Sequence, residues 1–503
     1  MNRPLDESLH MVVNGTAALK AITAVVFLAG VVAVAPHLHD EVWQDEAVTL
    51  LIYAAHGPLY PFTHYELPNN HILFSALLAV LHPEGESVFT LRLAMLAGWA
   101  LTLLLLWWTA RRTIGAFGAC VALAVMAASS VAQDFALQLR GYAFAWSWTL
   151  LVYVTASHAA TAGRLAAWLA LFGAATASVL IMPTNIIVNV TAVTAAWLAT
   201  WPSAGQPPLW RGAALYVMAG LGLAWYLVLH EQVTRLLGTD FSYWTAGGLL
   251  RHWWAATLLP WAWLAPLAAY GGWVLHRRPR TLVDAVPPGA ERRVLALIAA
   301  VVVVPTTAVV LAPAVPFPRN LVPLLPLLAL AAGGLVGAGL AGLPLNVAGR
   351  VAALAVLSLA VLIGGQWIAP CAGQLRPRAW PPDLCQHFYL EDYAPRATVR
   401  RLQDTLRGRT EPVMADDEIT WASAYVVRTT PVQPAYPLVH FRRWRRLVGV
   451  PPRFVLTHDL DRLATMLTLY GYGRPQRVER LWSTGFFVLY ELEWNDDVEP
   501  QGG

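Results

Sequence analysis

Long apolar segments separated by short polar ones fill the chain as far as residue 369. Each runs for about 20 residues, the length an α-helix needs to cross the hydrocarbon core of a bilayer. The pattern predicts about eleven membrane spans, at residues 17–37, 89–110, 113–132, 141–161, 164–182, 184–201, 211–230, 252–275, 293–313, 320–341 and 350–369. No small-residue cleavage site follows the first segment, which we therefore interpret as an uncleaved span.

Two regions depart from this pattern. The first loop, residues 38–88, contains an apolar segment at 69–82 that is too short to span, and we expect it to be a helix at the membrane surface. After Ala369 the spans stop and short alternating segments follow. They predict helices at 397–406 and 459–470 and strands at 412–415, 453–457 and 485–490. The expected fold is a polytopic α-helical membrane domain, residues 1–369, with a small α/β domain, residues 370–503.

The placement of arginine gives an orientation. Cytoplasmic ends of spans carry an excess of positive charge. The rule is satisfied with the N-terminus inside, because the inner ends then carry Arg111 and Arg112, Arg164, Arg211, Arg277 to Arg293, and Arg350. It places the first loop and the C-terminal domain on the outer side of the membrane. We expect a bacterial inner (plasma) membrane protein with an extracytoplasmic C-terminal domain.

Composition agrees with this class. Hydrophobic residues make up 57% of the chain and charged residues 13%, with a net charge of +4. No basic tail is present that would suggest a nucleic-acid partner. Of the three cysteines, Cys120 lies inside an apolar segment, whereas Cys371 and Cys385 flank a proline-rich stretch after the last span. We expect these two to form a disulfide in an oxidising compartment; two free thiols are the alternative.

A second set of arginines lies at the outer ends of spans, against the charge rule. Its members are Arg92, Arg140, Arg235, Arg251 and Arg319. A guanidinium matches phosphate oxygens in a bidentate geometry, and a lipid phosphate lies at this depth. The set therefore suggests an outward-facing cavity for an anionic ligand. For any one of these residues, the alternative is an arginine that only anchors its helix at the interface.

Two adjacent carboxylates, Asp45 and Glu46, follow the first span in the segment Trp43–Thr49. They should lie at the membrane surface, close to anything that a lipid presents. A carboxylate in such a place can take a proton from an acceptor nucleophile. The alternative is a solvated start to a surface helix.

Together these residues resemble the polytopic glycosyltransferases of the GT-C fold that use lipid-phosphate sugars. The branch is the one that holds the protein O-mannosyltransferases and the lipid A aminoarabinose transferases. The resemblance rests on five segments in matching order: residues 43–49, 68–71, 89–98, 133–143 and 318–326. Two positions depart from the pattern, because Ile72 and Leu73 follow His71 where His-Pro-Pro is frequent, and Leu137–Arg140 replaces a Glu-Ala-Arg sequence.

The resemblance implies roles for individual residues. Asp45 would be the general base, and Glu46 would orient or bind the acceptor. The donor phosphate would be held by Arg92, Arg140 and Arg319, and substrate would contact Asn70, His71, Asp134 and Tyr142. It further implies a polyprenyl-phosphate-sugar donor, a protein, glycolipid or cell-wall acceptor, and contacts with membrane lipids. No cofactor or metal site is expected, although the sequence leaves a divalent metal open.

Two other classes fit the many spans. A transporter or flippase of a lipid-linked glycan would show an internal repeat of spans, and we find none in the sequence. A structural subunit of an envelope complex would use the C-terminal domain for binding. The residues thus favour a glycosyltransferase that inverts the anomeric centre in one displacement.

Overall fold

The computed structural model describes most of the chain: residues 3–67, 70–81, 87–201, 209–237, 245–277, 287–312, 318–367, 395–407, 409, 411–416, 419–420, 426, 438–440, 448, 450–457, 460–469, 472, 474–484 and 487–494. The chain forms two compact units, which we describe one at a time. The first comprises Met1–Leu38, Leu59–Leu77 and Phe89–Cys385, and the second comprises His39–Pro58, Leu78–Val88 and Gln386–Gly503. Cys371 and Cys385 lie outside the described residues, and their pairing stays a prediction.

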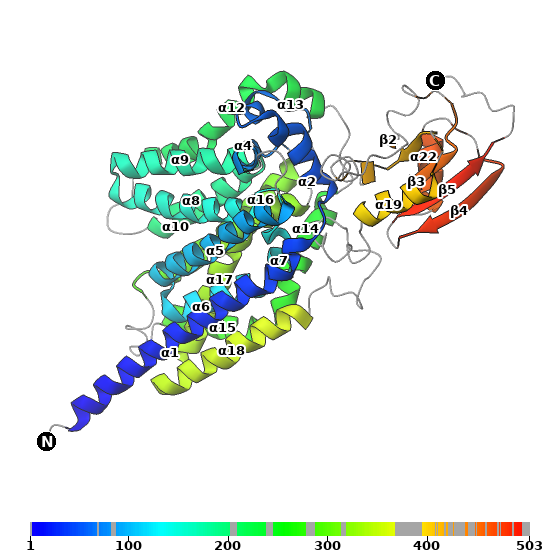
Figure 1. Ribbon diagram of the computed structural model, residues 1–503. Coiled ribbons are helices and arrows are strands. Elements are labelled where there is room, and N and C mark those ends of the chain that lie inside the picture. The colour runs from blue at the N-terminus through cyan, green and yellow to red at the C-terminus, as the bar shows by residue number, and fades with distance from the viewer. Residues whose placement is uncertain are drawn as a thin grey trace. The chain divides into compact units, whose positions relative to one another are not determined.

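The first unit is helical (Figure 1). Its elements are α1 (Arg3–Val34), η1 (Ala35–His39), α3 (Tyr60–Thr63), α4 (Ile72–Leu81), α5 (Val88–Thr113), α6 (Gly115–Ala128), α7 (Ser130–Ala136), α8 (Tyr142–Ala162), α9 (Leu165–Ile181), α10 (Asn185–Thr200), α11 (Leu209–Gly220), η4 (Leu221–Leu223), α12 (Ala224–Val228), α13 (His230–Leu237), α14 (Ala246–Leu258), η5 (Leu259–Leu264), α15 (Ala265–Arg277), α16 (Ala290–Leu311), η7 (Pro318–Leu324), α17 (Leu325–Gly342) and α18 (Val347–Trp367).

As far as the structure describes them, the segments predicted to span the membrane are helical. Within the described residues, seven helices are long and apolar enough to cross a membrane, and the pair α6 and α7, bent by 66°, makes up to eight. Three further expected segments form α8, α9 and α10, of which α9 and α10 have 17 and 16 residues. The larger number of about eleven spans stays a prediction. The short apolar segment of the first loop forms the ten-residue helix α4, as expected.

Apolar side chains cover the outside of this unit. Val25, Leu28 and Val32 on α1 are 62%, 58% and 64% exposed. Contiguous apolar surface of this kind is unfavourable in water and favourable against lipid. Helix α17 differs, because 83% of its most apolar window is buried inside the unit. The unit is therefore an integral membrane domain packed around a central helix (Figure 1).

Glycines at 333–342 let the neighbours of α17 approach its backbone. A Cβ added at Gly337 would lie 2.5 Å from the Cα of Gly118 on α6. On another face, a Cβ at Gly271 of α15 would lie 1.8 Å from the carbonyl oxygen of Leu335. No side chain fits at such distances, so helix packing here is backbone against backbone.

The second unit contains a mixed five-stranded sheet with the strand order β2-β1-β3-β5-β4. Its elements are α2 (Gln44–Val48), η2 (Thr49–Tyr53), η3 (Ala54–His56), α19 (Pro395–Thr405), β1 (Val413–Ala415), β2 (Leu438–His440), β3 (Phe454–Thr457), α22 (Leu460–Leu469), β4 (Arg477–Ser483) and β5 (Val488–Glu493). Strand β1 pairs in parallel with β2 and β3, whereas β5 pairs antiparallel with β3 and β4.

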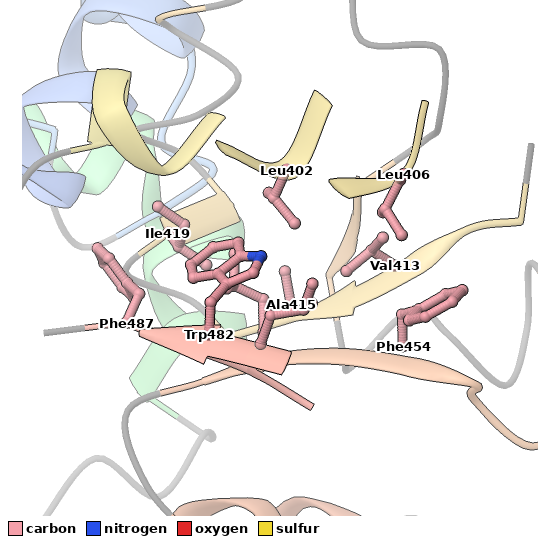
Figure 2. Close-up of a cluster of buried hydrophobic side chains, with 10 residues drawn as sticks. Leu402, Leu406, Val413, Ala415, Ile419, Phe454, Trp482 and Phe487 are labelled. Atoms are coloured by element: carbon pink, nitrogen blue, oxygen red, sulfur yellow. The ribbon is translucent and has the colours of Figure 1, made fainter. Parts of the chain in front are cut away.

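Alternation along the strands gives the sheet two apolar faces. Val413 and Ala415 of β1 belong to one cluster and Met414 between them to the other. We call the first the α19 cluster, because Leu402 and Leu406 of α19 cover it. Figure 2 shows its side chains: Leu402, Leu406, Val413, Ala415, Ile419, Phe454, Leu456, Trp482, Phe487 and Leu489. We call the second the α22 cluster, which consists of Met414, Val439, Val455, Leu463, Met466, Leu467, Tyr472, Val488, Tyr490 and Leu492.

The sequence predicted most of this domain. Helices α19 and α22 and strands β1, β3 and β5 are confirmed, although β5 begins at Val488 rather than 485. Strands β2 and β4 were not predicted. Strand β4 begins with four exposed residues that include Arg477 and Glu479, so it lacks the buried alternation that reveals a strand. Charges of this kind are typical of an edge strand, which β4 is.

Gly337→Ala should destabilise the membrane unit by about 1–3 kcal/mol, because its Cβ would overlap the α6 backbone. The measurement is thermal unfolding of the purified protein in detergent. Gly173→Ala on α9 is the matched control, since a Cβ there meets nothing within 4 Å. Alanine is the better helix former by up to ~1 kcal/mol, so the control should be neutral or stabilised. Equal effects at the two positions would contradict backbone packing at Gly337.

Candidate functional site

The two carboxylates of the first loop lie on the short helix α2 of the second unit. Asp45 is 6% exposed and Glu46 is 1% exposed. The Glu46 carboxylate accepts a hydrogen bond from the Trp43 backbone N–H at 2.9 Å and so caps the helix. The Thr49 hydroxyl donates to the Asp45 carbonyl oxygen at 2.9 Å. These contacts give Glu46 a defined structural task and hold Asp45 in the first turn of the helix.

The remaining predicted residues lie in the first unit. His71 is described first, because the other residues of the cluster lie next to it. His71 is 3% exposed, and its Nδ1 lies 2.9 Å from the carbonyl oxygen of Ile181. A carbonyl oxygen only accepts, so Nδ1 carries a proton and Nε2 is the acceptor of the neutral ring. Ile181 is the last residue of α9, where a helix leaves carbonyls without helical donors. The imidazole therefore caps α9 and has a fixed orientation.

Arg140 and Tyr142 meet His71 at the start of α8. The His71 and Tyr142 rings are 6.4 Å apart between centroids, and the Arg140 guanidinium lies 5.6 Å from the centre of the Tyr142 ring. A cation at this distance from an aromatic face is attracted to it. Arg140 is 4% exposed and Tyr142 is fully buried. We call His71, Arg140 and Tyr142 the α8 cluster; it combines a buried cation with an imidazole and a phenol.

Gly141 makes this arrangement possible. Its φ of 76° lies in the left-handed region, which side chains other than hydrogen disfavour. A Cβ at this position would also lie 2.7 Å from Phe74 of α4. The turn between α7 and α8 thus requires glycine on two independent grounds, and α4 packs directly against it.

One stripe of α8 connects this cluster to the arginine-proline segment η7. Tyr142, Trp146 and Thr149 are spaced i, i+4, i+7 and share a helix face. The Trp146 indole donates to the Val322 carbonyl oxygen at 2.9 Å, and the Thr149 hydroxyl donates to the Pro323 carbonyl oxygen at 3.1 Å.

Val322 and Pro323 both belong to the 3-10 helix η7. These bonds hold in place the η7 segment, on which Arg319 is half-buried.

The structure places the other predicted residues as follows. Arg92 on α5 is fully buried, and its Nη1 donates to the His37 carbonyl oxygen at 3.0 Å, which joins the ends of the first two spans. Asp134 on α7 is 2% exposed. Asn70 is fully buried, and its Nδ2 donates to the carbonyl oxygens of Pro61 and His64 at 2.9 and 2.8 Å.

The structure adds one residue that the sequence did not indicate, Gln232 on α13. Its side-chain amide accepts from the Tyr65 N–H and donates to the Thr63 carbonyl oxygen at 3.1 Å. These two groups belong to the residues on either side of His64, whose backbone is extended. The Gln232 amide therefore makes the same two hydrogen bonds to this segment that a residue of a neighbouring parallel β-strand would make. Asn70 bonds His64 at its carbonyl, and Gln232 and Asn70 together fix the loop segment that leads to His71.

The same loop segment carries an exposed set of polar side chains. The Tyr60 and His64 rings stack with centroids 3.8 Å apart, and the Tyr60 hydroxyl donates to Glu66 Oε1 at 2.6 Å. That hydrogen bond is the main cause that raises the pKa of Tyr60. Burial raises the pKa of the nearby Tyr65 hydroxyl. Both phenols are therefore neutral at physiological pH.

The described residues contain no group of three or more histidine, cysteine or acidic side chains placed to hold a metal ion. The buried polar side chains at the predicted positions of the first unit are arginine, histidine, tyrosine, asparagine and one carboxylate, Asp134. Arginine side chains only donate hydrogen bonds, which makes the α8 cluster suited to an anion.

Comparisons with known proteins identify the fold. No family model matches the chain, and no curated protein matches its sequence. Two crystal structures of ArnT from Cupriavidus metallidurans do match, each 14% identical over 94% of this chain and 98% of ArnT. The TM-score is 0.54 for the apo state and 0.52 for ArnT bound to undecaprenyl phosphate.

The protein is therefore an integral membrane protein with the fold of the GT-C membrane glycosyltransferases. The similarity to ArnT covers both the helical membrane domain and the small α/β domain that follows, since the match extends over 94% of this chain. The fold that the first-loop and arginine motifs predicted is confirmed.

Gln232→Met should loosen the first loop, because it keeps the length of the side chain and removes both hydrogen bonds to the loop backbone. Two lost bonds at about 0.5–1.5 kcal/mol each correspond to a roughly tenfold rise in amide exchange across residues 60–67. Hydrogen-exchange mass spectrometry measures this. Thr234→Ala, an exposed change on the same helix, is the control and should leave exchange unchanged. Unchanged exchange in Gln232→Met would show that the amide does not hold the loop.

Proposed function

We propose that this protein transfers a sugar from a polyprenyl-phosphate donor to an acceptor on the extracytoplasmic side of the membrane. The observation that carries the proposal is the buried α8 cluster of His71, Arg140 and Tyr142 within a GT-C fold. Ionisable side chains inside a membrane domain are rare and commonly mark the path of a charged ligand. ArnT, which has this fold, was crystallised with undecaprenyl phosphate.

In this proposal the acceptor oxygen attacks the anomeric carbon of the donor sugar while the bond from that carbon to the phosphate oxygen breaks. The electron pair of the broken bond leaves with the phosphate, and the proton of the acceptor goes to the Asp45 carboxylate. A single displacement inverts the anomeric centre. Arg92, Arg140 and Arg319 would stabilise the negative charge that builds on the leaving phosphate, because fixed cations act strongly in a poorly hydrated site.

The other assignments follow from the same proposal. Asn70, His71, Tyr142 and Asp134 would contact substrate, and Glu46 would hold the helix on which Asp45 acts. The lipid-linked sugar is itself a substrate, and the proposed reaction includes no cofactor. Membrane lipids surround the first unit, and a protein, glycolipid or cell-wall component would serve as acceptor. We place the protein in a bacterial inner membrane with the N-terminus in the cytoplasm.

Asp45→Asn should reduce sugar transfer by roughly 10²- to 10⁴-fold, the usual contribution of a general base. The assay uses protein reconstituted in liposomes with a radiolabelled polyprenyl-phosphate hexose and a membrane extract as acceptor source. Asp404→Asn, which changes an exposed carboxylate on α19, is the control. Label that crosses the bilayer without leaving the lipid, equally in wild type and Asp45→Asn, would replace the proposal with a transporter.

Arg319→Ala should raise the KM for the donor lipid by roughly 10- to 100-fold, because a charge-assisted hydrogen bond contributes about 1.5–3 kcal/mol. Thermal unfolding should change little, since Arg319 is only half-buried. Arg407→Ala, an exposed arginine outside the first unit, controls for the loss of positive charge. An unchanged KM with intact folding would remove Arg319 from the donor site.

A further inference from the structure

The second unit joins two parts of the chain that are far apart in sequence. His39–Pro58 of the first loop and Gln386–Gly503 of the C-terminal domain cluster into one compact body. Nothing in the sequence pattern pairs them. The first of these parts contains α2, which carries Asp45, and the second contains the sheet.

The contact between them is made by Trp43. Its side chain is half-buried and packs against the α19 cluster, the apolar face of the sheet shown in Figure 2. Indole is the largest side chain available for such a contact and buries more apolar area than any other. The α22 cluster on the opposite face of the sheet includes no residue of the first loop among the described side chains.

Trp43 is also the cap residue of the helix that carries Asp45. Its backbone N–H donates to the Glu46 carboxylate at 2.9 Å, and its carbonyl oxygen accepts from the Ala47 N–H at 2.8 Å. Both bonds fix the main chain of Trp43 to the first turn of α2. The residue whose indole packs against the sheet is therefore also fixed to the helical turn that contains Asp45.

We propose that the C-terminal domain positions the Asp45 carboxylate, and that Trp43 is the positioning residue through which it acts. The proposal rests on the proposed function in that Asp45 is the general base. It assigns the domain a task at the reacting end of the protein rather than the binding of a separate partner. In this proposal the apolar face formed by α19 and the sheet is the fixed surface against which α2, the helix that carries Asp45, is held.

The physical reason lies in how steeply proton transfer depends on geometry. A displacement of about 1 Å far from the reacting atoms can cost 10²-fold in rate. Removing the indole takes away the packing of Trp43 against the α19 cluster, although Glu46 still caps the helix. Catalysis should then suffer because Asp45 is misplaced, whereas donor binding, assigned to arginines of the first unit, should not change.

The test compares Trp43→Ala and Trp43→Phe with the wild type in the full-length reconstituted protein. Trp43→Ala should lower kcat by roughly 10- to 100-fold with the donor KM unchanged. Trp43→Phe keeps an aromatic ring against the cluster and should restore most of the rate. A rise in KM with unchanged kcat in Trp43→Ala would overturn the proposal.

A matched pair of changes in the domain separates positioning from general stability. Leu402→Ala removes a buried leucine of the α19 cluster, against which Trp43 packs, and Leu463→Ala removes one from the α22 cluster. Both should lower the unfolding temperature of the domain to a similar extent. Only Leu402→Ala should lower kcat and raise amide exchange in residues 43–53, by roughly tenfold. Equal effects of the two changes on kcat and on this exchange would refute positioning.

Amide exchange also keeps this proposal distinct from the proposed function. If the wild type transfers no sugar while Trp43→Ala and Leu402→Ala still release residues 43–53, the enzymatic function fails and the contact stands as a structural one. If wild-type transfer is robust and exchange in residues 43–53 is unaffected by either change, the enzymatic function stands and the positioning role fails.

Discussion

Backbone carbonyls without helical donors are the constraint on which the membrane unit depends. In a water-poor interior each such group costs several kcal/mol unless a donor reaches it. The chain creates such a carbonyl at the end of α9, where the His71 imidazole binds it, and the Trp146 indole binds the Val322 carbonyl of η7. Side chains at the candidate site are thus oriented by backbone groups that the helices leave exposed, and the α8 cluster and η7 are fixed by the same type of bond.

This constraint explains which parts of the site the sequence could reveal. Apolar length and arginine placement depend on single residues and on the bilayer, so they predicted the helices and selected Arg140 and Arg319. His71 and Tyr142 were found through the resemblance, and the structure places their rings 6.4 Å apart. Gln232 was not found, because a glutamine that binds backbone atoms in a distant loop leaves no mark on hydropathy or charge.

The same reasoning applies to the C-terminal domain. Strands β1, β3 and β5 carry buried residues and were predicted, whereas β4 is held by its pairing with β5 and shows an exposed, charged pattern. Residues 39–58 belong to this unit through tertiary contacts, which the local sequence pattern does not reveal. The structure also separates two acids that look alike in sequence. The Glu46 carboxylate is a helix cap, whereas Asp45 binds the Thr49 hydroxyl through its backbone carbonyl.

The joining of the first loop to the C-terminal domain has a consequence for how the protein is made. A ribosome produces the segment His39–Pro58 early and the sheet against which Trp43 packs last. At ordinary elongation rates the two are separated by on the order of tens of seconds. During that interval the sheet against which Trp43 packs has not yet been synthesised. The surface on which Trp43 packs is therefore completed only after every span has been made.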